Sequence, residues 1–91
     1  MTEKYLERKL VEKVAHIGGK AFKLTSPSTT GLPDRMVLMP GGRIWFVEMK
    51  KPGGKTSANQ VVIIGVLSYL GFDVRVINSI EQIEKFIIEI A

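Results

Sequence analysis

Apolar residues recur at helical spacing in three segments of the chain. Residues 2–17 place an aliphatic side chain every third or fourth position and are followed by two glycines, which predicts an amphipathic helix that ends there. Residues 57–60 read Ser-Ala-Asn-Gln, a capping box that predicts the start of a second helix, and residues 61–70 are apolar almost all the way round. A third helix is predicted after Ser79, where isoleucines form a regular stripe.

The segments between these helices are rich in β-branched, aromatic and other apolar residues, which is typical of strands. Residues 20–24 predict a first strand. The apolar runs on either side of the turn at residues 40–42 predict a hairpin whose second strand spans residues 43–50, and residues 74–77 predict a fourth strand. The expected order is αβββαβα, an α/β protein of the α+β kind with a single domain over residues 1–91.

Composition excludes several kinds of site. The chain has no cysteine and one histidine, so it cannot build a disulfide framework, a thiolate metal site or a multi-histidine site by itself. Its longest apolar run is too short and too interrupted for a membrane span or a signal peptide, and we expect a soluble intracellular protein.

The net charge of +4 is unevenly spread along the chain. Residues 1–60 carry eleven Lys and Arg against five Asp and Glu, whereas residues 61–91 carry two against four. This asymmetry favours a polyanionic partner for the first part of the chain, although many ordinary small domains are equally basic.

Two carboxylates and a lysine are predicted to meet at the open end of the hairpin. Side chains alternate along a strand, so Glu48 and Lys50 share one face, and pairing around the turn brings Asp34 across from them. Such a cluster suits a hard divalent cation, and phosphodiester hydrolysis uses this arrangement. The alternative is a surface pair of Glu48 and Lys50 with Asp34 as a turn acid. The apolar neighbours of Glu48 favour the metal site, because an unpaired acid is costly there.

A further acid, Glu7, falls inside the apolar stripe of the first predicted helix, one turn before Leu10. An acid at this position should face a group that compensates its charge, and the strand edge that bears the metal would do so. The alternative is a glutamate at the edge of the stripe whose carboxylate reaches water.

The motif residues resemble those of a known family, the VRR-NUC domain of the PD-(D/E)XK nuclease superfamily. They are the first hairpin acid with the residues around it, the second hairpin acid with the lysine two positions later, and a glutamine downstream of a basic glycine-rich loop: Gly31-x-Pro33-Asp34-Arg35, Glu48-x-Lys50 and Gln60. The resemblance runs from Glu7 to about Ile77 and extends to virus-encoded proteins that consist of this domain alone, which would place the chain in a host cytoplasm.

This resemblance implies a restriction-endonuclease-like core, a mixed sheet flanked by helices, and a metal-dependent, structure-specific DNA endonuclease. It implies Mg²⁺ or Mn²⁺ and no small-molecule cofactor. The implied catalytic residues are Glu7, Asp34, Glu48, Lys50 and Gln60. The implied metal ligands are Asp34, Glu48 and the backbone carbonyl of Met49, with Glu7 as an outer or second-metal ligand and Glu3 as the fallback on the same helix.

The expected partner is DNA, branched or duplex. Basic residues on both sides of the site are expected to grip its backbone: Lys23, Arg35, Lys51 and Lys55. A homodimer is expected, because a helix apolar all round in so small a domain needs cover on both sides and because the resemblance extends to dimeric Holliday-junction-resolving enzymes. The alternative function is a non-catalytic nucleic-acid-binding or assembly module on the same fold.

Overall fold

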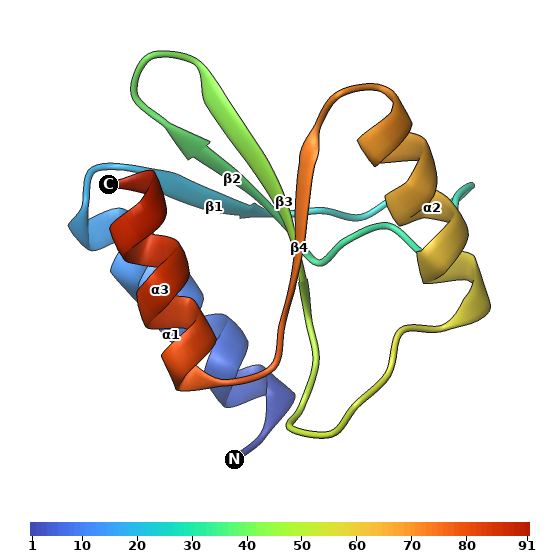
Figure 1. The fold of residues 1–91 in the computed structure, drawn as a ribbon, viewed down its shortest axis with the longest axis horizontal. Coiled ribbons are helices and arrows are strands. Elements are labelled where there is room, and N and C mark those ends of the chain that lie inside the picture. Colours follow the sequence, from blue (N-terminus) through green and yellow to red (C-terminus); the bar gives the residue numbers. More distant parts are fainter.

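The computed structural model describes residues 1–91 and confirms the predicted order of elements (Figure 1). Three helices and four strands follow one another along the chain: α1 (Glu3–His16), β1 (Lys20–Lys23), β2 (Arg35–Met39), β3 (Arg43–Met49), α2 (Ala58–Tyr69), β4 (Asp73–Ile77) and α3 (Ile80–Ile90). Each helix begins where the sequence places a cap, since the side chains of Thr2, Ser57 and Ser79 accept backbone hydrogen bonds from the first turns. None of the helices is long and apolar enough to cross a membrane.

The four strands form one mixed sheet in the order β1-β2-β3-β4. The first three strands pair antiparallel, and β4 pairs parallel to β3 after the crossover through α2. The hairpin register pairs Arg35 with Val47, so that the chain entering β2 lies beside the end of β3. This register places Asp34 next to Glu48, as the sequence predicts.

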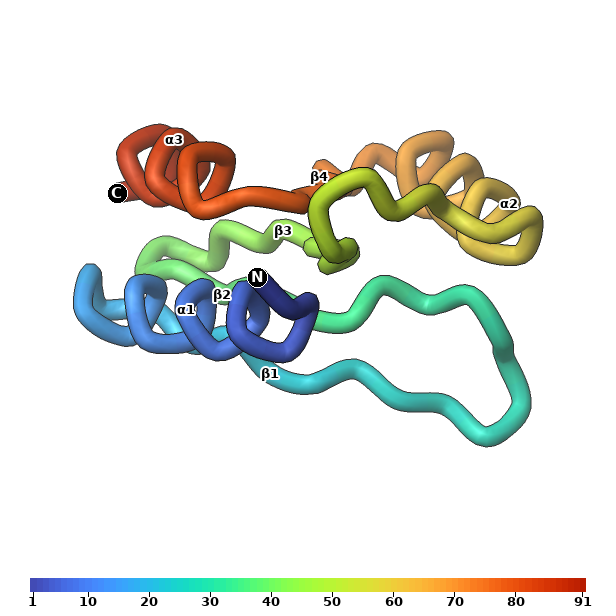
Figure 2. Tube along the Cα trace, turned by 90° about the horizontal axis from the view of Figure 1, so that it is seen from below, coloured from blue at the N-terminus to red at the C-terminus, as the bar shows by residue number.

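The hydrophobic core lies between one face of the sheet and the helices α1 and α3, which pack together at one end of the molecule (Figures 1 and 2). It contains twelve buried side chains: Leu6, Leu10, Val14, Ala21, Val37, Met39, Val47, Met49, Ile77, Ile83, Phe86 and Ile90. In β3 the core face is therefore the one that carries Val47 and Met49, and the opposite face carries Glu48.

The second face of the sheet is only partly covered. Figure 2 shows α2 at the far end of the molecule from α1 and α3, and α2 contributes no buried residue. Large apolar side chains on this side of the molecule stay exposed: Phe22, Ile44, Val61, Val62, Val66, Tyr69, Leu70, Phe72 and Val76. One part of this face is closed by an edge-to-face contact of Phe46 with Phe72, whose ring centroids lie 5.5 Å apart.

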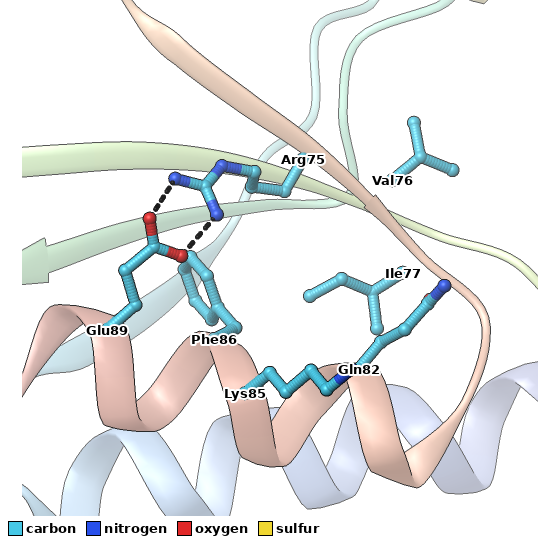
Figure 3. Close-up of a pocket in the computed structure, with 7 residues that line it drawn as sticks. All are labelled: Arg75, Val76, Ile77, Gln82, Lys85, Phe86 and Glu89. Carbon is cyan, nitrogen blue, oxygen red and sulfur yellow. Dashed lines mark hydrogen bonds and ion pairs between the residues drawn. The ribbon is translucent and has the colours of Figure 1, made fainter.

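An ion-pair network holds β4 to α3. The Arg75 guanidinium donates to both oxygens of Glu89 on α3, at 2.6 and 2.9 Å, and to both oxygens of Asp73 on its own strand. Figure 3 shows this bidentate pair beside Phe86, at the rim of a hollow between β4 and α3. The guanidinium lowers the pKa of the Asp73 and Glu89 carboxyls below their ordinary values. The network occupies the cationic head of Arg75, so this hollow offers no free guanidinium to a ligand.

The long loop between β1 and β2 runs alongside α2, as Figures 1 and 2 both show. The contact is close at Gly31, where an added Cβ would lie 2.6 Å from the carbonyl carbon of Asn59. Gly31 also has a φ of 87°, in the left-handed region that favours glycine. The loop is fastened a second time by the Asn59 side-chain amide, which donates to the Thr30 hydroxyl at 3.0 Å. Gly31 therefore sets how α2 sits against the loop that leads to Asp34.

We expect Gly31→Ala to destabilise the protein more than Gly18→Ala. Both glycines have positive φ, so both substitutions carry a backbone cost of about 1–2 kcal/mol. Only at Gly31 does the new methyl group meet backbone atoms, and this clash should add at least about 1 kcal/mol, whereas Gly18 faces open space. Urea unfolding of both variants measures the difference. Equal losses would show that the loop and α2 can separate freely.

Candidate metal centre

Three carboxylates converge at the end of the hairpin. Oxygens of Glu3, Asp34 and Glu48 all lie within 4.8 Å of one another. They come from three parts of the chain: Glu3 from the first turn of α1, Asp34 from the loop before β2, and Glu48 from β3. Glu3 is exposed, Asp34 is half-buried and Glu48 is buried, so the cluster is open on one side.

Glu48 is the most enclosed member of the cluster, with 1% of its surface exposed. Its Oε2 accepts a hydrogen bond from Gln60 Nε2 at 2.6 Å and lies 3.1 Å from Lys50 Nζ. Its Oε1 is buried and has no hydrogen-bond partner. Burial, together with the neighbouring Asp34 carboxylate, raises the pKa of Glu48, and the Lys50 ammonium opposes this only in part.

Asp34 is held in place by the backbone of the adjacent strand. Its Oδ2 accepts a hydrogen bond from the Met49 N–H at 2.7 Å. Burial raises the pKa of Asp34, the Met49 hydrogen bond acts in the opposite direction, and the Glu7 carboxylate raises it further. Two neighbouring acids with raised pKa values form a site where negative charge is incompletely compensated.

A divalent cation fits this site. The donor set consists of carboxylate oxygens, which hard cations such as Mg²⁺ and Mn²⁺ prefer. The unpartnered Oε1 of Glu48 is a buried acceptor that needs a donor or a cation, because a buried charged oxygen without a partner is costly. A bound cation would supply that partner and would also relieve the repulsion between Asp34 and Glu48.

The two acids of the first helix have different surroundings. Glu3, the fallback of the sequence analysis, is the one that lies in the carboxylate cluster. Glu7 accepts hydrogen bonds from Arg35, whose Nε and Nη2 both lie 2.7 Å from Glu7 Oε2. An acid on the apolar stripe does therefore face a compensating group, and in this structure that group is a guanidinium. A metal-ligand role for Glu7 stays a prediction.

Gln60 combines the two roles that the sequence left compatible. Its side-chain oxygen accepts from the Ser57 N–H at 2.8 Å, which completes the capping box of α2. The amide nitrogen of the same side chain donates to Glu48. The helix cap thus aims a hydrogen-bond donor into the carboxylate cluster.

The predicted DNA-gripping residues fall into two groups. Lys23, Lys51 and Lys55 are exposed. Arg35 is engaged inside the protein, because its Nη1 also donates to the Ala21 carbonyl at 3.3 Å while its other nitrogens hold Glu7. Sequence spacing did not reveal this pair, since its members lie 28 residues apart. Contact of any of these four residues with DNA stays a prediction.

The chain is similar to known proteins in both structure and sequence. A solved structure described as a VRR_NUC domain superposes with a TM-score of 0.86 at 30% identity, and the match covers all of both chains. A protein of Acyrthosiphon pisum secondary endosymbiont phage 1, named "Putative nuclease p44", is 44% identical over 77 residues, which is 85% of this chain and 83% of that protein. No family model matches the chain.

We expect the metal-free protein to lose stability as the pH rises through the raised pKa values of Asp34 and Glu48. The folded protein binds these two protons more tightly than the unfolded chain, whose carboxyls keep ordinary pKa values of 3.8 and 4.5. The free energy of unfolding therefore falls as both acids ionise. Glu48→Gln removes part of this loss, so its melting temperature relative to wild type should rise as the pH increases above about 4.5, the ordinary pKa of a glutamate.

Thermal unfolding in EDTA measures this difference, and Glu12→Gln, on the exposed side of α1, serves as the control. The melting temperature of the variant minus that of wild type reports on Glu48 alone. The contributions of Asp73 and Glu89, whose lowered pKa values act in the opposite direction, cancel in this difference. Parallel curves for Glu48→Gln and wild type over this range would mean that Glu48 ionises as an ordinary surface acid.

Proposed function

The chain belongs to the VRR_NUC family, and on that premise we propose that it is a metal-dependent DNA endonuclease that acts on branched DNA as a homodimer. Residues 1–91 form a single nuclease domain in this proposal. The observation that carries it is the cluster of Glu3, Asp34 and Glu48, in which a buried carboxylate oxygen lacks a partner.

Asp34, Glu48 and the Met49 carbonyl are the proposed ligands of Mg²⁺ or Mn²⁺, with Glu3 or Glu7 completing the set from α1. A divalent cation bound there supplies charge stabilisation for the phosphoryl oxygens and lowers the pKa of water. Hydrogen bonds hold both proposed carboxylate ligands in place, since Asp34 accepts from the Met49 N–H and Glu48 accepts from Gln60.

Hydrolysis requires that a water oxygen bond to phosphorus while the bond to the 3′ oxygen breaks. Water then loses a proton and the 3′ oxygen gains one. In this proposal the Lys50 ammonium, which lies 3.1 Å from Glu48 Oε2, donates a hydrogen bond to the attacking water and orients it. Gln60 steadies the same carboxylate through one N–H of its amide, and in this proposal the other N–H holds the water or the phosphate.

The proposed backbone contacts are made by exposed lysines on both sides of the cluster. Lys51 and Lys55 lie in the glycine-containing loop between β3 and α2, and Lys23 ends β1. Phosphate contacts of this kind position the substrate and carry no base specificity. A preference for DNA structure then depends on how the strands reach the cluster.

The homodimer is proposed from the uncovered apolar surface of α2 and the adjoining sheet face. Val62 is 63% exposed on α2, a helix with no buried residue, and Leu70, the C-cap of that helix, is 61% exposed. A second copy of the chain would remove this surface from water, and a dimer presents two clusters to one branched substrate.

Asp34→Asn and Glu48→Gln should each reduce cleavage by roughly a hundredfold or more, because each removes charge that a metal ligand must carry. Lys50→Ala should be nearly as damaging. Labelled duplex, flap, splayed-arm and four-way-junction DNAs, incubated with Mg²⁺, Mn²⁺ or EDTA, report the activity. Glu12→Gln is the matched control and should cut at the wild-type rate.

Cleavage by Glu48→Gln at the wild-type rate would mean that the cluster is misassigned. Salt-dependent binding to branched DNA without any cutting by the wild type would instead favour the non-catalytic nucleic-acid-binding module.

The dimer predicts a specific effect of Val62→Lys, which puts a charge on the exposed side of α2. This variant should weaken self-association at least tenfold, because a buried lysine without a partner is costly at an interface. Ile88→Lys, at a position 78% exposed on α3, should leave association unchanged. Sedimentation at micromolar concentration distinguishes the species, and a monomeric wild type would refute the proposal.

A further inference from the structure

A second hollow, of about 590 Å³, lies between the start of α1 and the strands β1 and β2. The residues that give it its chemistry are Lys4, Tyr5, Glu7, Arg8, Lys23 and Arg35. Its volume lies within the range of sites that enclose a small ligand, so it can take a nucleotide or two but not the width of a double helix.

The groove concentrates positive charge. Four of its side chains are cationic and one is a carboxylate, and that carboxylate, Glu7, is already paired with Arg35. Lys4, Arg8 and Lys23 have no carboxylate partner and are exposed to solvent. A ligand with negative charge would therefore meet cations that no protein group neutralises.

The groove adjoins the carboxylate cluster. Lys4 follows Glu3 directly on α1, and Arg35 follows Asp34 directly at the start of β2. The Lys23 ammonium lies near enough to Asp34 to oppose, in small part, the rise in the pKa of that carboxyl. A strand whose phosphate reaches the cluster can thus continue into the groove without leaving the protein surface.

Tyr5 provides an aromatic surface at the groove wall. The residue is 36% exposed, and the Arg8 guanidinium carbon and the Lys9 Nζ each lie 5.5 Å from the centre of its ring. Aromatic rings and guanidinium planes both stack on nucleobases. In a duplex the base faces are covered by their neighbours, so this kind of contact selects an unpaired base.

We infer that this groove binds a single-stranded DNA segment next to the cut, with Lys4, Arg8 and Lys23 on its phosphates and one unpaired base stacked on Tyr5. The inference rests on the proposed nuclease function and narrows its substrate to DNA with a single-stranded flank at the cleavage site. It also assigns Lys4, Tyr5 and Arg8 a role that the sequence motifs do not contain.

The test is binding of a fluorescently labelled single-stranded DNA, on the order of ten nucleotides long, measured in EDTA by anisotropy. The Lys4→Ala/Arg8→Ala double variant should bind it more weakly, and the slope of log affinity against log salt should shrink by about 0.7 per lost cation. The matched control is Lys20→Ala/Lys85→Ala, which removes the same charge from exposed positions outside the groove.

Variants of Tyr5 test the stacking contact separately from the phosphate contacts. Tyr5→Leu should weaken single-strand binding roughly tenfold, Tyr5→Phe should keep it, and neither should change binding of a blunt duplex. Equal binding by Tyr5→Leu and wild type, an equal loss on duplex, or an equal loss in the control double variant would each overturn the inference. These binding assays contain no metal and measure no cleavage. They can therefore fail or succeed independently of the nuclease proposal, which the Glu48→Gln cleavage assay tests.

Discussion

The burial of one carboxylate, that of Glu48, constrains most of the surrounding structure. Its strand position is set by the hairpin, its Oε2 is compensated by Gln60 and Lys50, and its Oε1 is left without a partner. An acid in this state costs free energy that an apolar residue of the same size would not. The acid lies at the point where the carboxylates of Asp34 and Glu3 also meet, so the proposed metal site contains the most costly side chain of the fold.

The two faces of the sheet have different roles. The face covered by α1 and α3 supplies the packed core, and the opposite face carries Glu48 and the partly covered apolar surface beside α2. Arg35 lies between these two regions. It is the first residue of β2, directly after Asp34, and its side chain binds Glu7 on α1. The same ion pair thus holds α1, which supplies Glu3, against the sheet. Its two residues also line the basic groove.

Much of the fold follows from local sequence. The capping residues, the isoleucine stripe of α3 and the Pro-Gly-Gly turn each act within a few positions, so order, boundaries and hairpin register could be predicted. Contacts between distant residues could not. Whether Glu3 or Glu7 reaches the cluster depends on the rotation of α1 against the sheet, and the closeness of Gly31 to Asn59 depends on how α2 docks. Nor does alternation in β3 by itself say which face the helices cover.

The sparse attachment of α2 has an energetic consequence. The helix has no fully buried side chain and is held through β4, the Asn59–Thr30 bond and the Gln60–Glu48 bond. Few buried apolar contacts are typical of an element of low local stability, and we expect α2 to detach and reclose while the core stays folded. Each detachment withdraws Gln60 from Glu48. Any protein that covers α2 would suppress these openings, so its binding and the ordering of the carboxylate cluster are thermodynamically linked, and each must strengthen the other.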